Sequence, residues 1–137
     1  MNWITLQTEH YKTMQTHVCA SLPEEACGML GGIGNHVQSL FLITNQAHSP
    51  VRYFMDPVEM VKAFHWLDEH GQELIATYHS HPAGPDHPSE TDLVEFMYPG
   101  TAMLIWYPDH RQRWRVKAYW IDERDYREIE VRKVVSA

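Results

Sequence analysis

The sequence predicts an α/β fold, a sandwich of two or three layers built on a mixed β-sheet. Segments with helical and strand patterns alternate in the first part of the chain, and strand-like segments follow one another near its end. Alternating helices and strands are typical of a sheet covered by helices, and consecutive strands are typical of a meander. With 137 residues, 44% of them hydrophobic, we expect a single domain over residues 1–137 with a core of its own.

Two segments have the pattern of long helices. Apolar residues recur at helical spacing in Thr8–Leu22, and Pro23 ends this segment. Asp56 and Pro57 form a typical helix start, and the second helix is expected to run to about His70. The apolar positions that define the two helices are Tyr11, Met14, Val18 and Leu22 in the first, and Val58, Val61, Phe64 and Leu67 in the second.

A third, short helix is expected from Ser89 to about Met97, after a Pro- and Gly-rich loop at residues 81–88. The pair Gly34-Asn35 predicts a hairpin between the first two strands, with Glu25 at the mouth of the first. Alternation or short apolar runs predict strands at Ala26–Gly32, His36–Thr44, Arg52–Met55, Glu73–Ser80, Ala102–Tyr107, Trp114–Ile121 and Glu128–Val135.

Composition argues against several classes of function. The chain has 18 acidic and 11 basic side chains, a formal charge of −7, which opposes binding to nucleic acid or to an anionic membrane. No apolar run approaches the roughly 20 residues that span a bilayer. The two cysteines, Cys19 and Cys27, form no CxxC pair, and the N-terminus lacks a signal-peptide pattern, so we expect a cytoplasmic, reduced protein.

The strongest chemical pattern is the pair His79 and His81 at the end of a predicted strand. Residues two apart on a strand point to the same face of the sheet, so the two imidazoles form a two-nitrogen site. A carboxylate from the next element would complete the three ligands typical of catalytic zinc, and Asp92 is placed to supply it. Such a site leaves one position open, where bound water ionises near neutral pH.

The same chemistry needs a proton carrier and a donor to the developing oxyanion. A carboxylate not committed to the metal suits the first role, and the candidates are the adjacent Glu24 and Glu25, of which only one can face the site. Ser89, three residues before Asp92, could donate its hydroxyl to a tetrahedral intermediate without acting as a nucleophile.

Each residue also has a plain structural interpretation. A pair of histidines two apart means little in a chain with 10 histidines, and Ser89 followed by Asp92 is a good helix start. Cys27 is best interpreted as a small core residue near the site. Asp86 and His87 lie in the loop and could contact substrate or metal, although the turn chemistry around them is the better explanation. The combination of all motif residues in order is what makes the catalytic interpretation specific.

The string Pro-Glu-Glu25-Ala-Cys-Gly-Met-Leu-Gly-Gly, followed by His79-Ser-His81-Pro, seven residues between His81 and Ser89, and Ser89-x-x-Asp92, resembles the JAMM or MPN-plus metallopeptidase family. The resemblance covers nearly the whole chain and is greatest to the compact prokaryotic type. It implies a deaminase-like sandwich, a curved mixed β-sheet flanked by about three helices. It also implies His79, His81 and Asp92 as Zn²⁺ ligands, Glu25 as the acid/base and Ser89 as the stabiliser of the intermediate.

Three hypotheses for function follow. The first is a zinc-dependent metallopeptidase or isopeptidase that hydrolyses an amide bond at the Gly-Gly-type tail of a ubiquitin-like or sulfur-carrier protein, a substrate class that the resemblance implies. The second is a hydrolase of free peptides or small amides. The third is a non-enzymatic MPN-type interaction module, for which Glu25→Gln would change nothing. Divalent ions other than zinc stay open as the metal in the cell.

Overall fold

A mixed sheet of seven strands closes on itself in the computed structural model, which describes residues 1–135. The elements along the described chain are β1 (Trp3–Gln7), α1 (Thr8–Ala20), β2 (Cys27–Ile33), β3 (His36–Ile43), α2 (Pro57–Glu69), β4 (Glu73–Ser80), α3 (Glu90–Glu95), β5 (Ala102–Pro108), β6 (Trp114–Asp122) and β7 (Asp125–Val134). A mixed sheet with three helices confirms the predicted fold class.

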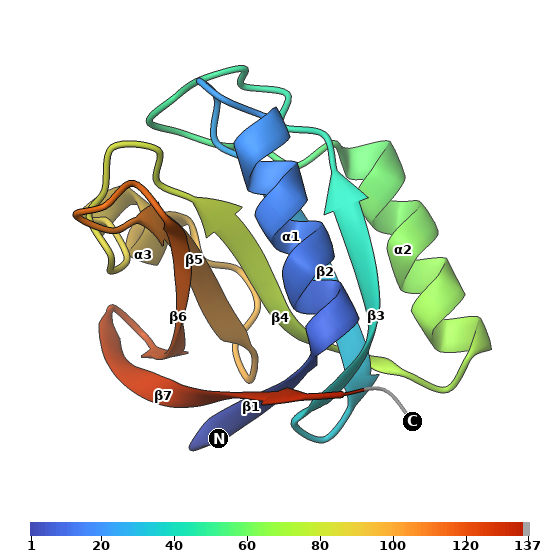
Figure 1. The fold of residues 1–137 in the computed structure, drawn as a ribbon. Coiled ribbons are helices and arrows are strands. Elements are labelled where there is room, and N and C mark those ends of the chain that lie inside the picture. Colours follow the sequence, from blue (N-terminus) through green and yellow to red (C-terminus); the bar gives the residue numbers. More distant parts are fainter. Residues whose placement is uncertain (136–137) are drawn as a thin grey trace.

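The strands follow the order β1-β3-β2-β4-β5-β6-β7 around the sheet. β4 and β5 run parallel, β1 runs parallel to β7 and β3, and the remaining neighbours are antiparallel. The closure is weak on one side, because β1 and β3 share the single pair Thr5↔His36. β1 and β7, from the two ends of the chain, lie side by side along five residue pairs (Figure 1).

The inner face of the sheet is covered by α1, which crosses it from end to end (Figure 1). Met14 and Val18 of α1 are fully buried in a cluster with Leu30 of β2 and with Leu104 and Trp106 of β5. This cluster is the main core. Of the four apolar positions predicted for the first helix, Met14 and Val18 are fully buried in it.

The outer face is covered by the other two helices. Ala63 of α2 packs into a cluster with residues of β2 and β3, including Met29, and Leu93 of α3 packs against Met103 of β5. α2 begins as predicted, because the Asp56 carboxylate accepts the backbone N–H groups at the start of the helix. β4 lies between β2 and β5 in the sheet, so its carboxyl end emerges between α2 and α3.

Several expected boundaries were wrong. Residues 52–55 form no strand, and only an isolated bridge joins Asn45 to Met55. β1 was not predicted, α1 ends at Ala20 rather than Leu22, and α3 ends at Glu95 rather than Met97. β2 spans Cys27–Ile33 rather than Ala26–Gly32, and β3 ends one residue before the predicted Thr44. β5, β6 and β7 each extend beyond one predicted end. No helix within the described chain is long and apolar enough to cross a membrane.

The inward face of α2 also differs from the spacing noted in the sequence. Ala63 and Leu67 are its buried residues, four apart, whereas Val58, Val61 and Phe64 are exposed. The apolar residues that recur every three positions therefore lie mostly on the outside of this helix.

Candidate metal centre

The candidate metal centre lies where β4 ends. The backbone N–H of Ser80 donates to the Ala26 carbonyl oxygen at 3.0 Å, and the Ser80 hydroxyl oxygen accepts the Ala26 N–H at 2.8 Å. These bonds hold the end of β4 against the segment that carries Glu25. His79 and His81 leave the same face, as predicted, and their Nε2 atoms lie 3.1 Å apart.

Asp92 reaches both imidazoles from the first turn of α3. Its Oδ2 atom lies 3.0 Å from the Nε2 atom of His79 and 3.0 Å from that of His81. A capping box orients this carboxylate, because Asp92 Oδ2 accepts the backbone N–H of Ser89 while the Ser89 hydroxyl oxygen accepts that of Asp92. The structure therefore brings together the three residues that the sequence proposed as ligands.

These three atoms fit a divalent metal ion. In a tetrahedral zinc site with bonds of about 2.0–2.1 Å, neighbouring ligand atoms lie about 3.3 Å apart, close to the separations of 3.0 and 3.1 Å. His81 donates its Nδ1–H to the Pro85 carbonyl oxygen at 2.7 Å, which leaves the Nε2 lone pair of the neutral ring directed at the centre. The two Nε2 atoms and the carboxylate oxygen of Asp92 face one another, so together they can serve as the ligands of a cation.

The pKa values of Asp92, His79 and His81 are shifted by burial and by the hydrogen bonds among these residues. Burial alone would raise the pKa of Asp92, but hydrogen bonds with His79 and His81 lower it well below its usual range. Burial lowers the pKa of His79 more than Asp92 raises it. For His81 burial is outweighed by hydrogen bonds with Asp92 and the Pro85 carbonyl, and its pKa rises. The Asp92 carboxylate thus stays ionised between the two imidazoles.

Glu25 lies beside the two imidazoles and is buried. One of its carboxylate oxygens lies within 4.8 Å of a ring nitrogen of each histidine, and Oε1 has no hydrogen-bond partner among residues 1–135. Burial raises the pKa of Glu25 to about 8; nearby His81 opposes this rise and Asp92 adds to it.

Glu25 and Asp92 therefore compete for the third ligand position. Asp92 contacts both imidazoles and is oriented by Ser89, whereas Oε1 of Glu25 has no hydrogen-bond partner among residues 1–135. Glu24, the alternative base, points elsewhere: its carboxylate lies 3.0 Å from His48 Nδ1 on the surface.

The chain is similar to several known proteins. A model of the family described as prokaryotic homologs of the JAB domain, Prok-JAB, matches residues 7–121. The chain belongs to this family. A protein of Desulfitobacterium hafniense, solved in solution, shares 31% identity and a TM-score of 0.86 over 97% of this chain and 94% of its own. A JAB1/MPN domain protein of Archaeoglobus fulgidus shares the fold, with 23% identity and a TM-score of 0.61 over 96% of both chains.

Three curated relatives of this Prok-JAB chain are peptidases by name. The desampylase of Pyrococcus furiosus is 39% identical over 62% of this chain and 61% of its own length. A probable TtuB-protein conjugate cleaving protease of Thermus thermophilus is 35% identical over 59% and 55%. The CysO-cysteine peptidase of Mycobacterium tuberculosis is 28% identical over 66% and 63%. The chain thus matches somewhat less than two thirds of each relative.

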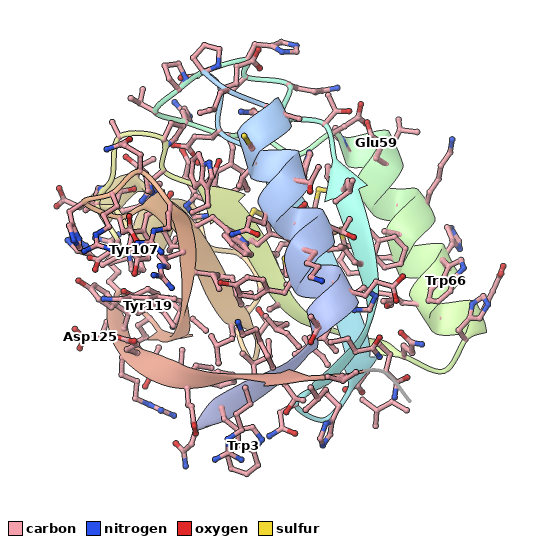
Figure 2. The ribbon with its side chains drawn as sticks, viewed as in Figure 1. Trp3, Glu59, Trp66, Tyr107, Tyr119 and Asp125 are labelled. Carbon is pink, nitrogen blue, oxygen red and sulfur yellow. The ribbon has the colours of Figure 1, made fainter. Side chains whose placement is uncertain are left out.

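Asp86 and His87, the two loop residues of this Prok-JAB chain whose role the sequence left open, make contacts with β6 and β7. Asp86 forms an ion pair of 2.7 Å with Lys117, and its carbonyl oxygen accepts the hydroxyl of Tyr119, which Figure 2 labels on the opposite side of the molecule from Trp66. His87 stacks on Tyr126 with ring centroids 6.2 Å apart. These contacts fasten the loop to β6 and β7 and thereby support the Pro85 carbonyl that orients His81.

Cys27 lies in the core beneath the site, as expected. It is fully buried, and its Sγ atom donates to the Ile43 carbonyl oxygen at 3.4 Å. Burial, with the nearby Glu25 and Glu59 carboxylates, raises the pKa of this thiol to about 12, which keeps it protonated and unreactive.

Sequence reasoning missed Tyr53 and Asn45. The Tyr53 ring stacks on His79, with centroids 4.4 Å apart and planes inclined by 26°. Asn45 is buried, and its amide donates to the Glu25 carbonyl oxygen at 3.0 Å. Neither stands at a regular spacing from the motif, because both belong to the irregular segment between β3 and α2. No pattern in the sequence marks them.

Proposed function

We propose that this protein is a zinc-dependent peptidase or isopeptidase that hydrolyses an amide bond at the C-terminal Gly-Gly-type tail of a ubiquitin-like or sulfur-carrier protein. The observation that carries the proposal is the convergence of His79 Nε2, His81 Nε2 and Asp92 Oδ2 beside the buried carboxyl of Glu25. The names of the relatives support the substrate class, since they describe cleavage of protein conjugates and of a carrier-cysteine adduct.

In this proposal His79, His81 and Asp92 hold the zinc ion, which when bound would lower the pKa of water and polarise the scissile carbonyl. Glu25 takes the proton of the attacking water and delivers it to the leaving amine. A carboxyl with a raised pKa suits both transfers, because its proton affinity lies near the working pH. The Ser89 hydroxyl donates to the oxyanion of the tetrahedral intermediate.

A protein substrate is favoured over a small amide by the surface around the site. Val58 and Val61 of α2 and Met97 after α3 are 64%, 55% and 77% exposed, and Phe64 contacts Tyr98 with ring centroids 6.0 Å apart. α2 and the segment after α3 therefore carry exposed apolar side chains and meet at Phe64 and Tyr98, which is typical of a surface that binds another protein.

The test begins with metal content. Protein purified without added metal and analysed for its elements should hold about one zinc per chain, and His79→Ala and Asp92→Ala should lose it, while His87→Ala keeps it. Native protein that stays metal-free after zinc is supplied would overturn the proposal.

Turnover is tested on a small ubiquitin-like carrier whose Gly-Gly tail is joined to a reporter by an amide bond. Native protein should release the carrier, and Glu25→Gln should retain zinc but lose activity by about 10²- to 10⁴-fold. Equal activity in Glu25→Gln would exclude the proton-transfer role. Cleavage of short peptide amides at the same rate as the carrier fusion would favour the small-amide alternative.

A further inference from the structure

The two imidazoles of the candidate metal centre are held in different ways. His81 has a hydrogen bond from Nδ1 to the Pro85 carbonyl oxygen. His79 is fully buried, yet its Nδ1 has no hydrogen-bond partner within the described chain. Metal-binding histidines almost always have such a partner, which fixes the rotation of the ring and thus the direction of the metal-binding nitrogen. Another contact has to fix the ring of His79.

Tyr53 makes that contact. Its ring lies nearly parallel to the imidazole of His79, with centroids 4.4 Å apart and an inclination of 26°. The ring of His81 lies 4.9 Å from His79 at 64°. Rotation of the His79 ring about its Cβ–Cγ bond would drive its edge into Tyr53. The stack therefore restricts the one torsion that a hydrogen bond at Nδ1 would otherwise set.

The backbone on both sides of Tyr53 is fixed by one buried side chain. Asn45 donates to the Arg52 carbonyl oxygen at 3.1 Å and accepts the Phe54 N–H at 3.0 Å. The same amide group donates to the carbonyl oxygen of Glu25. Tyr53 is thus fixed relative to the segment that carries the proposed base, although its own segment has no regular secondary structure.

We propose that Tyr53 is a positioning residue for His79, which holds the imidazole by stacking in place of the missing hydrogen bond at Nδ1. This inference rests on the proposed function, because it concerns the direction of a metal ligand. Its content is specific: the aromatic ring of Tyr53 matters for metal binding, and its hydroxyl does not.

The experiment measures zinc affinity by competition with a chromophoric chelator, and the electronic spectrum of the Co²⁺-substituted protein. Tyr53→Phe keeps the ring, whereas Tyr53→Leu and Tyr53→Met replace it with flexible apolar groups. Phe54→Leu is the matched control, since Phe54 is the neighbouring aromatic residue and is 56% exposed. Thermal unfolding of each metal-free variant identifies those that fold.

Tyr53→Phe and Phe54→Leu should bind zinc within about twofold of native protein, with an unchanged cobalt spectrum. The folded non-aromatic variants should bind about 10- to 100-fold more weakly, with shifted cobalt bands. Native affinity and spectrum in Tyr53→Leu or Tyr53→Met would overturn the role of Tyr53, as would equal losses in Tyr53→Phe. A native protein that binds neither ion would overturn the proposed function itself, and the two failures are thus distinguishable.

Discussion

The Ser89 hydroxyl caps α3 and is also the proposed donor to the oxyanion. It accepts the backbone N–H of Asp92 at 3.0 Å, so the capping interpretation of the sequence is correct for this residue. An accepting hydroxyl still has its own proton to donate. Donation to the oxyanion therefore stays a prediction that is compatible with the cap, and a substitution has to separate the two roles.

Ser89→Gly separates them. Glycine at a helix N-cap costs only a few tenths of a kcal/mol relative to serine, whereas loss of an oxyanion donor costs about 10²- to 10³-fold in turnover. We expect Ser89→Gly to keep its zinc and nearly all its stability but to lose turnover on the carrier fusion by about that factor. Ser89→Thr, which restores a hydroxyl, should recover most of it. Turnover in Ser89→Gly within a few-fold of native would show that the hydroxyl serves only as a cap.

Single residues differ in how far the sequence could identify them. His79, His81, Ser89 and Asp92 fall in one short string whose spacing is set by local structure, a strand end and a helix start, so the pattern is legible without the fold. Tyr53 is different, because its contact with His79 depends on the path of an irregular segment fixed by buried hydrogen bonds. Such a contact has no period and no spacing that a sequence could display.

Helices and strands that are bounded by local sequence signals were predicted well. A strand that depends on pairing with a distant part of the chain was not. Pro57, Gly71 and the Gly34 turn mark boundaries through backbone chemistry, and the elements beside them were predicted closely. β1 was missed because it is short and its partner β7 comes from the other end of the chain. α2 was found, but the spacing of its apolar residues does not mark its buried face, since its exposed face is also apolar.

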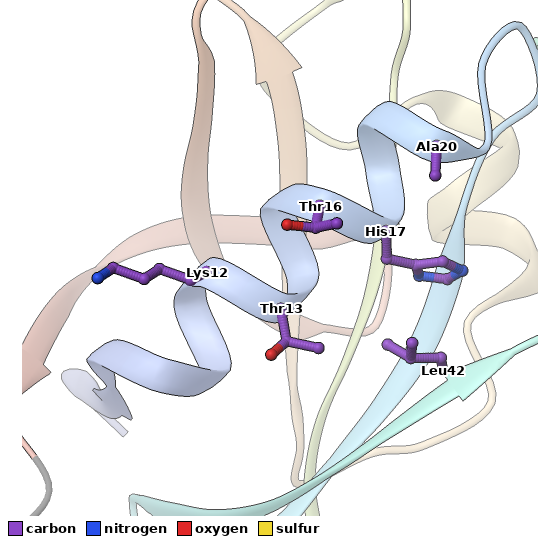
Figure 3. Close-up of a pocket in the computed structure, with 6 residues that line it drawn as sticks. All are labelled: Lys12, Thr13, Thr16, His17, Ala20 and Leu42. Atoms are coloured by element: carbon purple, nitrogen blue, oxygen red, sulfur yellow. The ribbon is translucent and has the colours of Figure 1, made fainter.

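The packing of α1 gives a pH dependence of stability. His17 projects from α1 and lines a groove between this helix and Leu42 of β3 (Figure 3). Its Nδ1 atom is hydrogen-bonded to the hydroxyl oxygen of the buried Tyr78 at 2.6 Å, and burial lowers the pKa of His17 below its ordinary value of 6.5. The unfolded chain therefore takes up a proton near pH 6.5 that the folded protein binds only at lower pH. The contribution is fully present above pH 6.5 and is lost as the pH falls.

We expect the free energy of unfolding of metal-free protein to fall more steeply below pH 6.5 than that of His17→Gln, by at most about 1.4 kcal/mol per pH unit for one proton. Glutamine keeps an acceptor for Tyr78 but does not titrate. Urea unfolding between pH 5 and 7.5 measures the difference in free energy of unfolding between the two proteins. Both proteins contain the proposed metal ligands, so protons bound by those residues do not contribute to this difference. His110→Gln, at an exposed position, is the control. Parallel pH profiles for native protein and His17→Gln would contradict the assignment.

In the whole molecule, the two faces of the sheet serve different purposes. The inner face, with α1, holds the main core, and the outer face supports the candidate site between α2 and α3. The exposed apolar residues that recur every three positions in α2 then have an interpretation. Val58, Val61 and Phe64 are exposed, and Phe64 contacts Tyr98 in the segment after α3, so the three residues extend the apolar surface formed with that segment.

Val61→Glu tests whether this surface binds the body of the carrier. Val61 is exposed, so a charge there should change stability by no more than about 0.5 kcal/mol, while it opposes contact with an apolar patch. We expect KM for the carrier fusion to rise about tenfold or more, with kcat little changed and with unchanged cleavage of a short peptide that carries the same tail. Ile33→Glu, an equally exposed apolar position at the far end of β2, should alter neither substrate. If Val61→Glu slows the peptide and the fusion alike, the effect belongs to the active site rather than to docking. Equal KM values for Val61→Glu and native protein would mean that the carrier is recognised by its tail alone.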